Sequence, residues 1–418
     1  MNKKVTIAQM SDLHFSGDNL AESERCFGHA VTQAIERKVT GAIITGDSTD
    51  HAMDAHVPAI RALANHIKRL ADHCPVLLLQ GTFSHEPPGL LAIFSLLGAR
   101  HRITVADKIG SFGLIAGDCF ELVDAKNRSH DYYDLVIHAL PTLNKADIAA
   151  LTSKEVGEAS AHVGEIVNSV LQSWGPVNNG LRQSGTASMV ISHGTVLNCL
   201  SEHGVPMAGV DHEFGVGSLF SARADAVALG HIHKHQAWRQ DTLGFSQVIA
   251  YAGSIGRFHH GEEGDKHWLE WCMEAGTTDF IAHITPSRRT VDLFFDGPPD
   301  MEELRRVAST CEGAYVRVRY AVDEEHRQSV DREAIKAALA GAAGVQIEGK
   351  TLVIERSRSK GISTAPSLAE KLGKWCEATQ TEGTPMLERL SKLMNEGADT
   401  IVKDAVRQEE DALELQHH

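Results

Sequence analysis

The segment Val5-Thr6-Ile7-Ala8-Gln9-Met10-Ser11-Asp12-Leu13-His14 combines a strand with a pair of side chains that can bind a metal. Residues 5–10 form a short, mostly apolar run of the kind found in strands buried on both faces of a sheet. Asp12 and His14 follow directly, and alternate residues of an extended chain point to the same side. The segment therefore predicts a buried strand whose end carries two ligands for one ion.

Four other apolar runs end in residues of the same chemistry. Gly46-Asp47 follows residues 41–45, and the segment Gly81–Glu86, which contains His85, follows residues 76–80. His193-Gly194 follows residues 188–192, and Gly230-His231-Ile232-His233 follows residues 226–229. Segments with helical spacing of apolar residues separate the first three runs, and this alternation predicts an α/β core. In such a core, ligands bind beyond the carboxyl ends of the strands. We therefore expect these strand ends to converge on one site: Asp12, His14, Asp47, His85, His193, His231 and His233.

The ligand types point to divalent metal ions. Carboxylate oxygens mixed with imidazole nitrogens, without thiolates, suit borderline-hard ions. Mn²⁺ is the favoured ion, with Fe²⁺, Zn²⁺ and Mg²⁺ as alternatives. Three histidines and two aspartates already exceed the three protein ligands usual for a single catalytic zinc, so we expect two ions, roughly 3.5–4 Å apart. Asp47 is the natural bridge between them, because a carboxylate can give one oxygen to each ion.

The composition limits the classes of protein. A chain of 418 residues suggests two or three domains. The formal net charge of −15 argues against a protein that holds nucleic acid by bulk positive charge alone. The seven cysteines include no CxxC pair, which disfavours a disulfide scaffold and predicts a reducing, cytoplasmic environment. The apolar runs are too short to cross a bilayer, so we expect no membrane association.

A change of composition near Pro286 divides the chain. Residues 1–285 carry the strand ends described above. Residues 286–358 alternate strands and helices in the pattern of a small α+β domain. A hinge is expected over residues 357–366, and residues 359–418 form a linker followed by a polar, helical segment.

Within residues 1–285, one stretch predicts a helix followed by a loop. Residues 151–174 have helical spacing and predict a helix. The run 175–185 is rich in Gly, Asn and Ser and predicts a loop. The next strand is expected to start after this loop.

The ordered motifs resemble a known family. Asp12-x-His14, Gly46-Asp47, His85, His193-Gly194 and Gly230-His231-x-His233 follow one another as in the calcineurin-like metallophosphoesterase superfamily. Residues 251–258 and 313–326 are similar to the SbcD-type nuclease, the catalytic partner of the ATPase SbcC. The resemblance implies a four-layer α/β β-sandwich flanked by helices, with a small α+β capping domain that binds DNA and a C-terminal helical segment.

The same resemblance implies an activity and roles for the residues. It implies a metal-dependent DNA nuclease, an exonuclease or endonuclease, that acts in an SbcCD-like complex in DNA repair or recombination. One ion would be held by Asp12, His14, Asp47 and His233, and the other by Asp47, His193 and His231. Protonated His85 would assist the departing ribose oxygen, a role that imidazole suits. Asp50 and Ser254 are expected to orient ligands rather than to bind metal.

The third motif departs from the family. The family has Gly-Asn-His followed by Asp or Glu, whereas this chain has Gly81-Thr82-Phe83-Ser84-His85-Glu86, with two extra residues and no Asn. Alignment from the right places Ser84 at the Asn position, and alignment from the left places Thr82 there. A hydroxyl is a poorer neutral metal ligand than an amide carbonyl. Two alternatives remain open: an active enzyme with a remodelled loop, or one with an impaired second metal site.

The resemblance also implies partners. Two roles are open for the basic residues Arg257, Lys266 and the pair Arg288-Arg289. They could line the path by which a DNA substrate reaches the site, or they could be ordinary surface charges. The C-terminal segment has apolar residues at helical spacing that suit docking onto an SbcC-like coiled-coil ATPase, or packing on their own chain. They are Leu368, Leu372, Trp375, Met386, Leu387, Leu390, Leu393 and Met394. A homodimer is expected from the family.

Two other functions remain open at this point. One is a small-substrate phosphodiesterase or phosphatase of the same superfamily, which would not need the capping domain or the apolar tail. The other is a non-catalytic subunit that binds DNA or the ATPase and keeps the fold with a degraded second metal site. The altered third motif is the only support for the latter.

Overall fold

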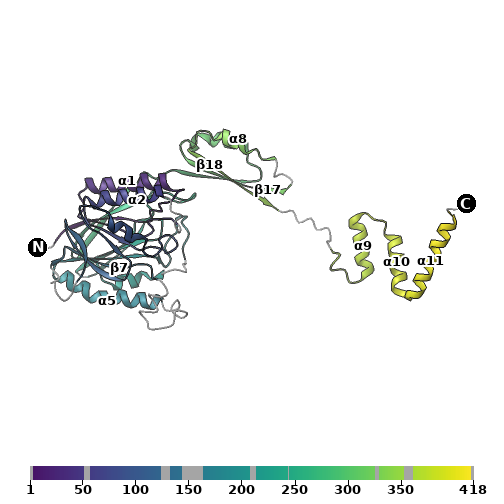
Figure 1. Ribbon diagram of the computed structural model, residues 1–418, viewed down its shortest axis with the longest axis horizontal. Coiled ribbons are helices and arrows are strands. Elements are labelled where there is room, and N and C mark those ends of the chain that lie inside the picture. The colour runs from purple at the N-terminus through teal and green to yellow at the C-terminus, as the bar shows by residue number, and fades with distance from the viewer. Residues whose placement is uncertain are drawn as a thin grey trace. The chain divides into compact units, whose positions relative to one another are not determined.

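A computed structural model describes residues 3–50, 57–123, 132–143, 163–207, 213–242, 244–324, 329–352 and 361–415, with side chains as far as residue 407 (Figure 1). The chain separates into two compact units. One comprises Met1–Tyr320 and Asp331–Gly349, and the other Ala321–Val330 and Lys350–His418. All the candidate site residues lie in the first unit.

The first sheet contains the strand nearest the N-terminus. Its order is β15-β14-β1-β2-β3-β4, in which β1 to β4 run parallel and β14 and β15 pair antiparallel. The bounds are β1 Val5–Met10, β2 Gly41–Ile44, β3 Val76–Leu79, β4 Ile103–Ala106, β14 His267–Glu274 and β15 Thr277–Ile284. Because β1, β2 and β3 are parallel, the segments that follow them emerge at one edge of the sheet.

The second sheet has the order β12-β13-β11-β8-β7-β5-β6. The four strands β13, β11, β8 and β7 are parallel, and β12, β5 and β6 are antiparallel additions. The bounds are β5 Gly110–Ile115, β6 Cys119–Leu122, β7 Leu135–Leu140, β8 Ala187–His193, β11 Ala226–Gly230, β12 Gln236–Thr242 and β13 Phe245–Tyr251. The short pair β9 (Thr195–Val196) and β10 (Glu213–Phe214) lies beyond β8.

Alternating side chains of the strands fill separate cores on the two faces of each sheet. In β1, Ile7 belongs to the core between the sheets, whereas Ala8 belongs to the core beneath α1 (Leu20–Glu36) and α2 (Val57–Ala71). In β8, Met189 faces the other sheet, whereas Val190 packs with residues of α5 (Val163–Gln183) and α6 (Val216–Ser221). Burial on both faces explains why these strands read as continuous apolar runs.

Three cores of this kind require four layers, in the order helices, sheet, sheet, helices. Figure 1 shows α1 and α2 on one side of the sheets and α5 on the other. A 3₁₀ helix, η1 (Leu90–Leu96), also packs on the first core. The expected α/β sandwich flanked by helices is therefore confirmed.

The prediction of a loop over residues 175–185 is wrong. The helix α5 continues through Pro176 to Gln183. Its buried residues Leu171, Trp174, Asn178 and Leu181 recur every three or four positions, so one face stays against the sheet despite the glycines and asparagines. Packing of that face outweighs their low helix propensity. The part of the expected helix over residues 151–162 lies outside the described residues.

The expected order of strands and helices after residue 286 is observed. A three-stranded sheet, β16-β17-β18, carries two helices and a 3₁₀ turn. The bounds are β16 Thr290–Asp296, α7 Met301–Val307, η4 Ala308–Cys311, β17 Tyr315–Asp323, α8 Arg332–Ala338 and β18 Gly344–Leu352. Asp300 and Asp331 cap the two helices by accepting bonds from backbone N–H groups in their first turns. The division at residues 285 and 358 stays a prediction.

The C-terminal segment is helical, as expected. It contains α9 (Leu368–Thr379), α10 (Gly383–Asn395) and α11 (Ala398–Leu415). The part of the expected hinge over residues 357–360 lies outside the described residues. None of the described helices combines the length and the apolar character needed to span a bilayer.

Candidate metal centre

The strand ends of the two sheets bring their acidic and imidazole side chains together. Among the described residues, four groups of three have possible ligand atoms within 4.8 Å of one another, and two of these groups consist entirely of predicted metal ligands. The first cluster is Asp12, His14 and His233, and the second cluster is Asp47, His193 and His231. These six are the residues that the sequence predicts as metal ligands. Each cluster combines residues from both sheets, so the site exists only when the sheets pack face to face.

In the first cluster, two imidazoles face each other. The Nε2 atoms of His14 and His233 are 3.0 Å apart. Asp12 is fully buried, and its carboxylate accepts hydrogen bonds from Ser11 Oγ at 2.6 Å and from the His231 backbone N–H at 3.0 Å. The latter bond ties the two clusters together, because Asp12 and His231 belong to different ones.

In the second cluster, a backbone contact fixes the orientation of a histidine. His193 Nδ1 donates to the carbonyl oxygen of Thr45 at 2.8 Å, which leaves Nε2 to face Asp47 Oδ2 at 3.2 Å. This arrangement is typical of a metal-binding histidine, whose second nitrogen is usually held by a carbonyl or carboxylate. The structure groups Asp47 with the second cluster, and its bridging role stays a prediction.

The backbone at the ligands is strained. Asp12, His14, Asp47 and His231 have φ values of 50°, 45°, 51° and 97°. Eight described residues other than glycine have positive φ, so half of them are candidate ligands. Non-glycine residues in this region cost of order 1–3 kcal/mol each and persist where the surrounding structure imposes them, commonly at functional sites. The positive φ values are a backbone property, independent of the metal-binding chemistry of the side chains, and they point to the same site.

The residues present fit a pair of cations. Burial opposes ionisation of Asp47, yet His193 beside it holds the pKa of this carboxyl below its usual range. Burial likewise opposes protonation of His193, but the Asp47 carboxylate raises the pKa of His193 to about 10. The second cluster thus favours a positive charge next to Asp47. His233 Nδ1 is buried and has no hydrogen-bond partner among the described residues.

His85 lies beside the first cluster. Its Nδ1 is 3.2 Å from Asp50 Oδ1, and its ring contacts that of His14 edge to face at 5.0 Å. Asp50 also lies 3.7 Å from His14 Nδ1, so it can orient both rings, in line with the role expected from the sequence. The hydrogen bond that His85 donates to the Asp50 carboxylate raises the pKa of His85, against the effect of burial.

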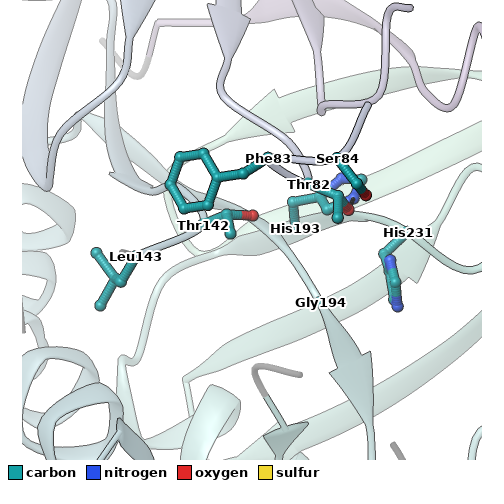
Figure 2. Close-up of a pocket in the computed structure, with 8 residues that line it drawn as sticks. All are labelled: Thr82, Phe83, Ser84, Thr142, Leu143, His193, Gly194 and His231. Atoms are coloured by element: carbon teal, nitrogen blue, oxygen red, sulfur yellow. Dashed lines mark hydrogen bonds between the residues drawn. The ribbon is translucent and has the colours of Figure 1, made fainter. Parts of the chain in front are cut away.

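Of the two candidate hydroxyls in the altered motif, Thr82 lies at the second cluster. Its backbone N–H donates to Asp47 Oδ1 at 2.7 Å, and its Oγ1 lies 3.3 Å from Asp47 Oδ2 and 3.2 Å from His193 Nε2. Ser84 is exposed and lines a pocket next to the cluster, together with Thr82 and His193 (Figure 2). The geometry corresponds to the alignment from the left.

Sequence reasoning assigned no role to Glu86, which holds the ligand-bearing loops together. Its side chain is fully buried and accepts from the backbone N–H groups of Ser48, at 2.5 Å, and Gly81, at 2.6 Å. Burial, reinforced by the nearby Asp47, raises the pKa of Glu86 to about 7. The signal in the sequence is an acidic residue directly after His85, at the end of the third motif.

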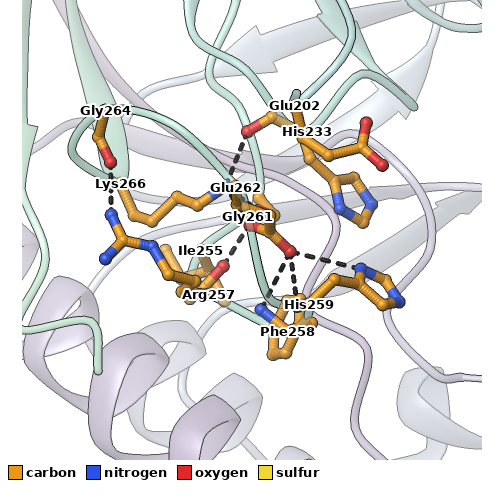
Figure 3. A network of polar contacts seen from close by, with 12 residues as sticks. Glu202, His233, Ile255, Arg257, Phe258, His259, Gly261, Glu262, Gly264 and Lys266 are labelled. Carbon is orange, nitrogen blue, oxygen red and sulfur yellow. Dashed lines mark hydrogen bonds and ion pairs between the residues drawn. The ribbon is translucent and has the colours of Figure 1, made fainter. Parts of the chain in front are cut away.

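A buried ion pair supports His233 from behind (Figure 3). Lys266 Nζ lies 2.5 Å from Glu262 Oε2 and donates to the carbonyl oxygen of His233 at 3.0 Å and to Ser254 Oγ at 2.9 Å. The Ser254 backbone N–H donates to the same carbonyl at 3.2 Å. Ser254 therefore touches the ligand segment, as expected, whereas the role of Lys266 in holding it was missed.

The basic residues expected near a DNA path are engaged within the protein. Lys266 is 1% exposed, so the expectation that it lines the approach is wrong. The guanidinium of Arg257 donates to the carbonyls of Arg288 and Gly264, and that of Arg288 donates to those of Arg257 and Phe258. Arg289 donates to two carbonyls of the small α+β region. These cations hold loops in place.

Comparison with known proteins gives a structural likeness. No protein-family model and no curated protein match the sequence. Among solved structures, the chain is similar to a dimetal phosphatase from Danio rerio, with 13% sequence identity and a TM-score of 0.41. The likeness covers 68% of this chain and 99% of that one.

Proposed function

We propose that the protein is a metal-dependent phosphodiesterase, and more specifically a DNA nuclease. The observation that carries the proposal is the pairing of two three-residue ligand clusters with a histidine, His85, beside the first of them. Two cations side by side suit the hydrolysis of a phosphodiester, in which negative charge develops on the attacking, leaving and non-bridging oxygens.

The residues divide into two ligand sets and one proton donor. Asp12, His14 and His233 would hold one ion, and Asp47, His193 and His231 the other, with Mn²⁺ as the favoured metal. When bound, such a pair supplies a Lewis acid and a water of lowered pKa. Thr82 holds the Asp47 carboxylate through its backbone N–H, so that the carboxylate keeps one orientation.

His85 is proposed as the general acid. Because Asp50 engages its Nδ1, the proton available to a substrate is the one on Nε2. Transfer of that proton to the departing oxygen avoids the release of a free alkoxide, an effect that typically contributes 10²–10⁴-fold. The His85 side chain is 22% exposed, so a phosphate ester can reach it.

Two assays separate the roles. With Mn²⁺ present, the wild-type protein should hydrolyse both linear DNA and bis(p-nitrophenyl) phosphate. His85→Ala should lose about 10²–10⁴-fold in kcat on DNA but much less on the aryl ester, because p-nitrophenolate departs without a proton. His29→Ala, a half-buried histidine of α1, is the control and should change neither rate. Equal losses of His85→Ala on both substrates, with metal content unchanged, would contradict the acid role.

A small-substrate phosphodiesterase is the second candidate. The observation that favours it is that Arg257, Lys266 and Arg288 are occupied by carbonyls or buried, and that the net charge is −15. Hydrolysis of the aryl ester without any cleavage of DNA would select this function. Binding of fewer than two ions, with neither substrate cut, would exclude both enzymes.

We also propose that the C-terminal helices bind a coiled-coil ATPase partner of the SbcC type. Leu368, Trp375, Leu393 and Met394 are 56%, 40%, 63% and 65% exposed, so apolar side chains of α9 and α10 are open to a partner. Trp375→Glu combined with Leu393→Glu should abolish co-purification with the ATPase and leave the aryl-ester activity unchanged. The expected homodimer remains a prediction, to be tested by light scattering.

A reducing, cytoplasmic location is proposed on the state of the cysteines. All seven are free thiols, and five of them are buried. Burial raises the pKa of Cys26 and of Cys74 to about 12, which keeps both thiols protonated and unreactive. Titration of the unfolded protein with a thiol reagent should find seven reactive groups without prior reduction.

A further inference from the structure

The pocket beside the second cluster has an apolar end that metal binding does not use. Its volume is about 250 Å³, and His193 and His231 line it together with Phe83, Ser84, Thr142 and Leu143. In the view of Figure 2, Phe83 and Leu143 lie on one side of the pocket and His231 on the other. A substrate group attached to a phosphate at the cluster would therefore extend towards a phenyl ring and a leucine.

The loop holds Phe83 in place from both sides. The residue before it, Thr82, is fixed to Asp47 by its backbone N–H at 2.7 Å. The carbonyl oxygen of Thr82 accepts from the backbone N–H groups of His85, at 2.9 Å, and Glu86, at 2.8 Å. Glu86 is itself fully buried. The half-buried phenyl ring thus projects from a closed turn with two anchored ends, and little ordering is needed when a ligand binds.

A second part of the lining comes from the segment after β7. Leu143 is 7% exposed, and the Thr142 backbone N–H donates to the carbonyl oxygen of Gln80 at 3.3 Å, which ties this segment to the end of β3. The pocket is therefore bounded by two segments that belong to different sheets. Thr142 and Ser84 add hydroxyl groups to a lining that is otherwise apolar at this end.

We propose that this apolar end binds the planar ring of the group esterified to the scissile phosphate, a nucleobase in nucleic acid, stacked on Phe83. The inference rests on the proposed phosphodiesterase function and extends it to a substrate class. Pockets that enclose a whole drug-sized ligand have roughly 300–1,000 Å³, so this smaller one suits a single ring system. Stacking on an aromatic side chain tolerates every base, because every base has a π-face. Phe83 is thus a specificity-determining residue that favours nucleotides over ring-free phosphate esters.

The test compares two sugar phosphates, one with a nucleobase and one without. Binding of thymidine 5′-monophosphate and of 2-deoxyribose 5-phosphate to the Mn²⁺-loaded full chain is measured by isothermal titration calorimetry. Loss of one base–aromatic stack corresponds to about a 5- to 150-fold change in affinity, so wild type should favour the nucleotide by a factor in this range. Phe83→Ala should reduce the ratio to near one, and Phe83→Trp should retain it.

The control is another phenylalanine. Phe294, on β16, is 70% exposed, and Phe294→Ala should keep the wild-type ratio. Equal affinity of the wild type for the two phosphates, or a ratio that survives in Phe83→Ala, would overturn the proposal. Failure of the phosphodiesterase function is a separate result: the chain would then cleave neither DNA nor the aryl ester, whatever the binding ratio.

Discussion

Replacement of Lys266 by methionine should destabilise the fold and weaken metal binding at the first cluster. The ammonium lies 2.5 Å from Glu262 Oε2, 2.9 Å from Ser254 Oγ and 3.0 Å from the carbonyl oxygen of His233. Removal of one half of a buried ion pair typically costs about 3–5 kcal/mol, since the other charge is left without its partner. Glu262 keeps two bonds from the backbone N–H groups of Phe258 and His259, which places the expected loss at the lower end, about 3 kcal/mol.

The assay is chemical unfolding of the metal-free chain, followed by tryptophan fluorescence. Two fully buried tryptophans, Trp268 and Trp271, lie on β14, just after Lys266, and report on this region. A double variant, Lys266→Met with Glu262→Gln, should recover most of the loss, because no buried charge remains unpaired. Lys68→Met removes an exposed ion pair on α2, with side chains 44% and 45% exposed, and should cost less than about 1 kcal/mol.

Metal affinity gives the second measurement. Without the ammonium, the bond from the Ser254 backbone N–H is the one that the His233 carbonyl keeps among the described residues, so the ligand segment should be less well held. Loss of such an outer partner typically weakens metal binding by about 10–100-fold. The d–d absorption of the Co²⁺-loaded protein should change in the single and double variants alike. The reasoning is refuted if Lys266→Met unfolds like wild type, or if the double variant is no more stable than the single one.

Three further perturbations have definite expected outcomes. Asp47→Asn should lower Mn²⁺ affinity at the second cluster, which calorimetry measures, since it replaces a negatively charged oxygen ligand by a neutral amide. Burial lowers the pKa of His138 to about 4, so below about pH 6.5 the unfolded chain binds a proton that the native state refuses. Stability should therefore fall by about 2 kcal/mol between pH 7.5 and pH 5 through this group, and the fall should be smaller in His138→Phe. Gly230→Ala should prevent correct closure of the site, because a Cβ there would lie 2.0 Å from the Thr45 carbonyl oxygen. At Gly217, in α6, an added Cβ would meet no atom of the described residues within 4 Å, so Gly217→Ala should be stable, as circular dichroism will show.

The strands and their ends could be predicted because burial on both faces leaves a clear mark in the sequence. β1 begins and ends where the apolar run does, at Val5 and Met10. The ligands follow for a topological reason, since parallel strands deliver their carboxyl ends to one edge. The same logic, applied to single residues, could not choose between Thr82 and Ser84, because the choice depends on how the loop turns.

Other features depend on packing that composition does not reveal. The helix α5 passes through Pro176 and a run of glycine and asparagine, and only its contact with the second sheet explains why. The burial of Lys266 could not be foreseen either, because its partner Glu262 is four residues away, a spacing also common on exposed helices. From the sequence, a lysine near a candidate nuclease site is readily interpreted as a DNA contact. In the structure, Lys266 instead holds the segment that carries His233.

The left-handed backbone at Asp12, His14, Asp47 and His231 has a consequence for how such a scaffold changes over time. These conformations suit glycine, so a chain freed from selection for chemistry would gain stability by giving up the side chains that hold the ions. Activity could then disappear while the sandwich became harder to unfold. Thermostable but inert descendants of this architecture should therefore carry their first substitutions at these four positions.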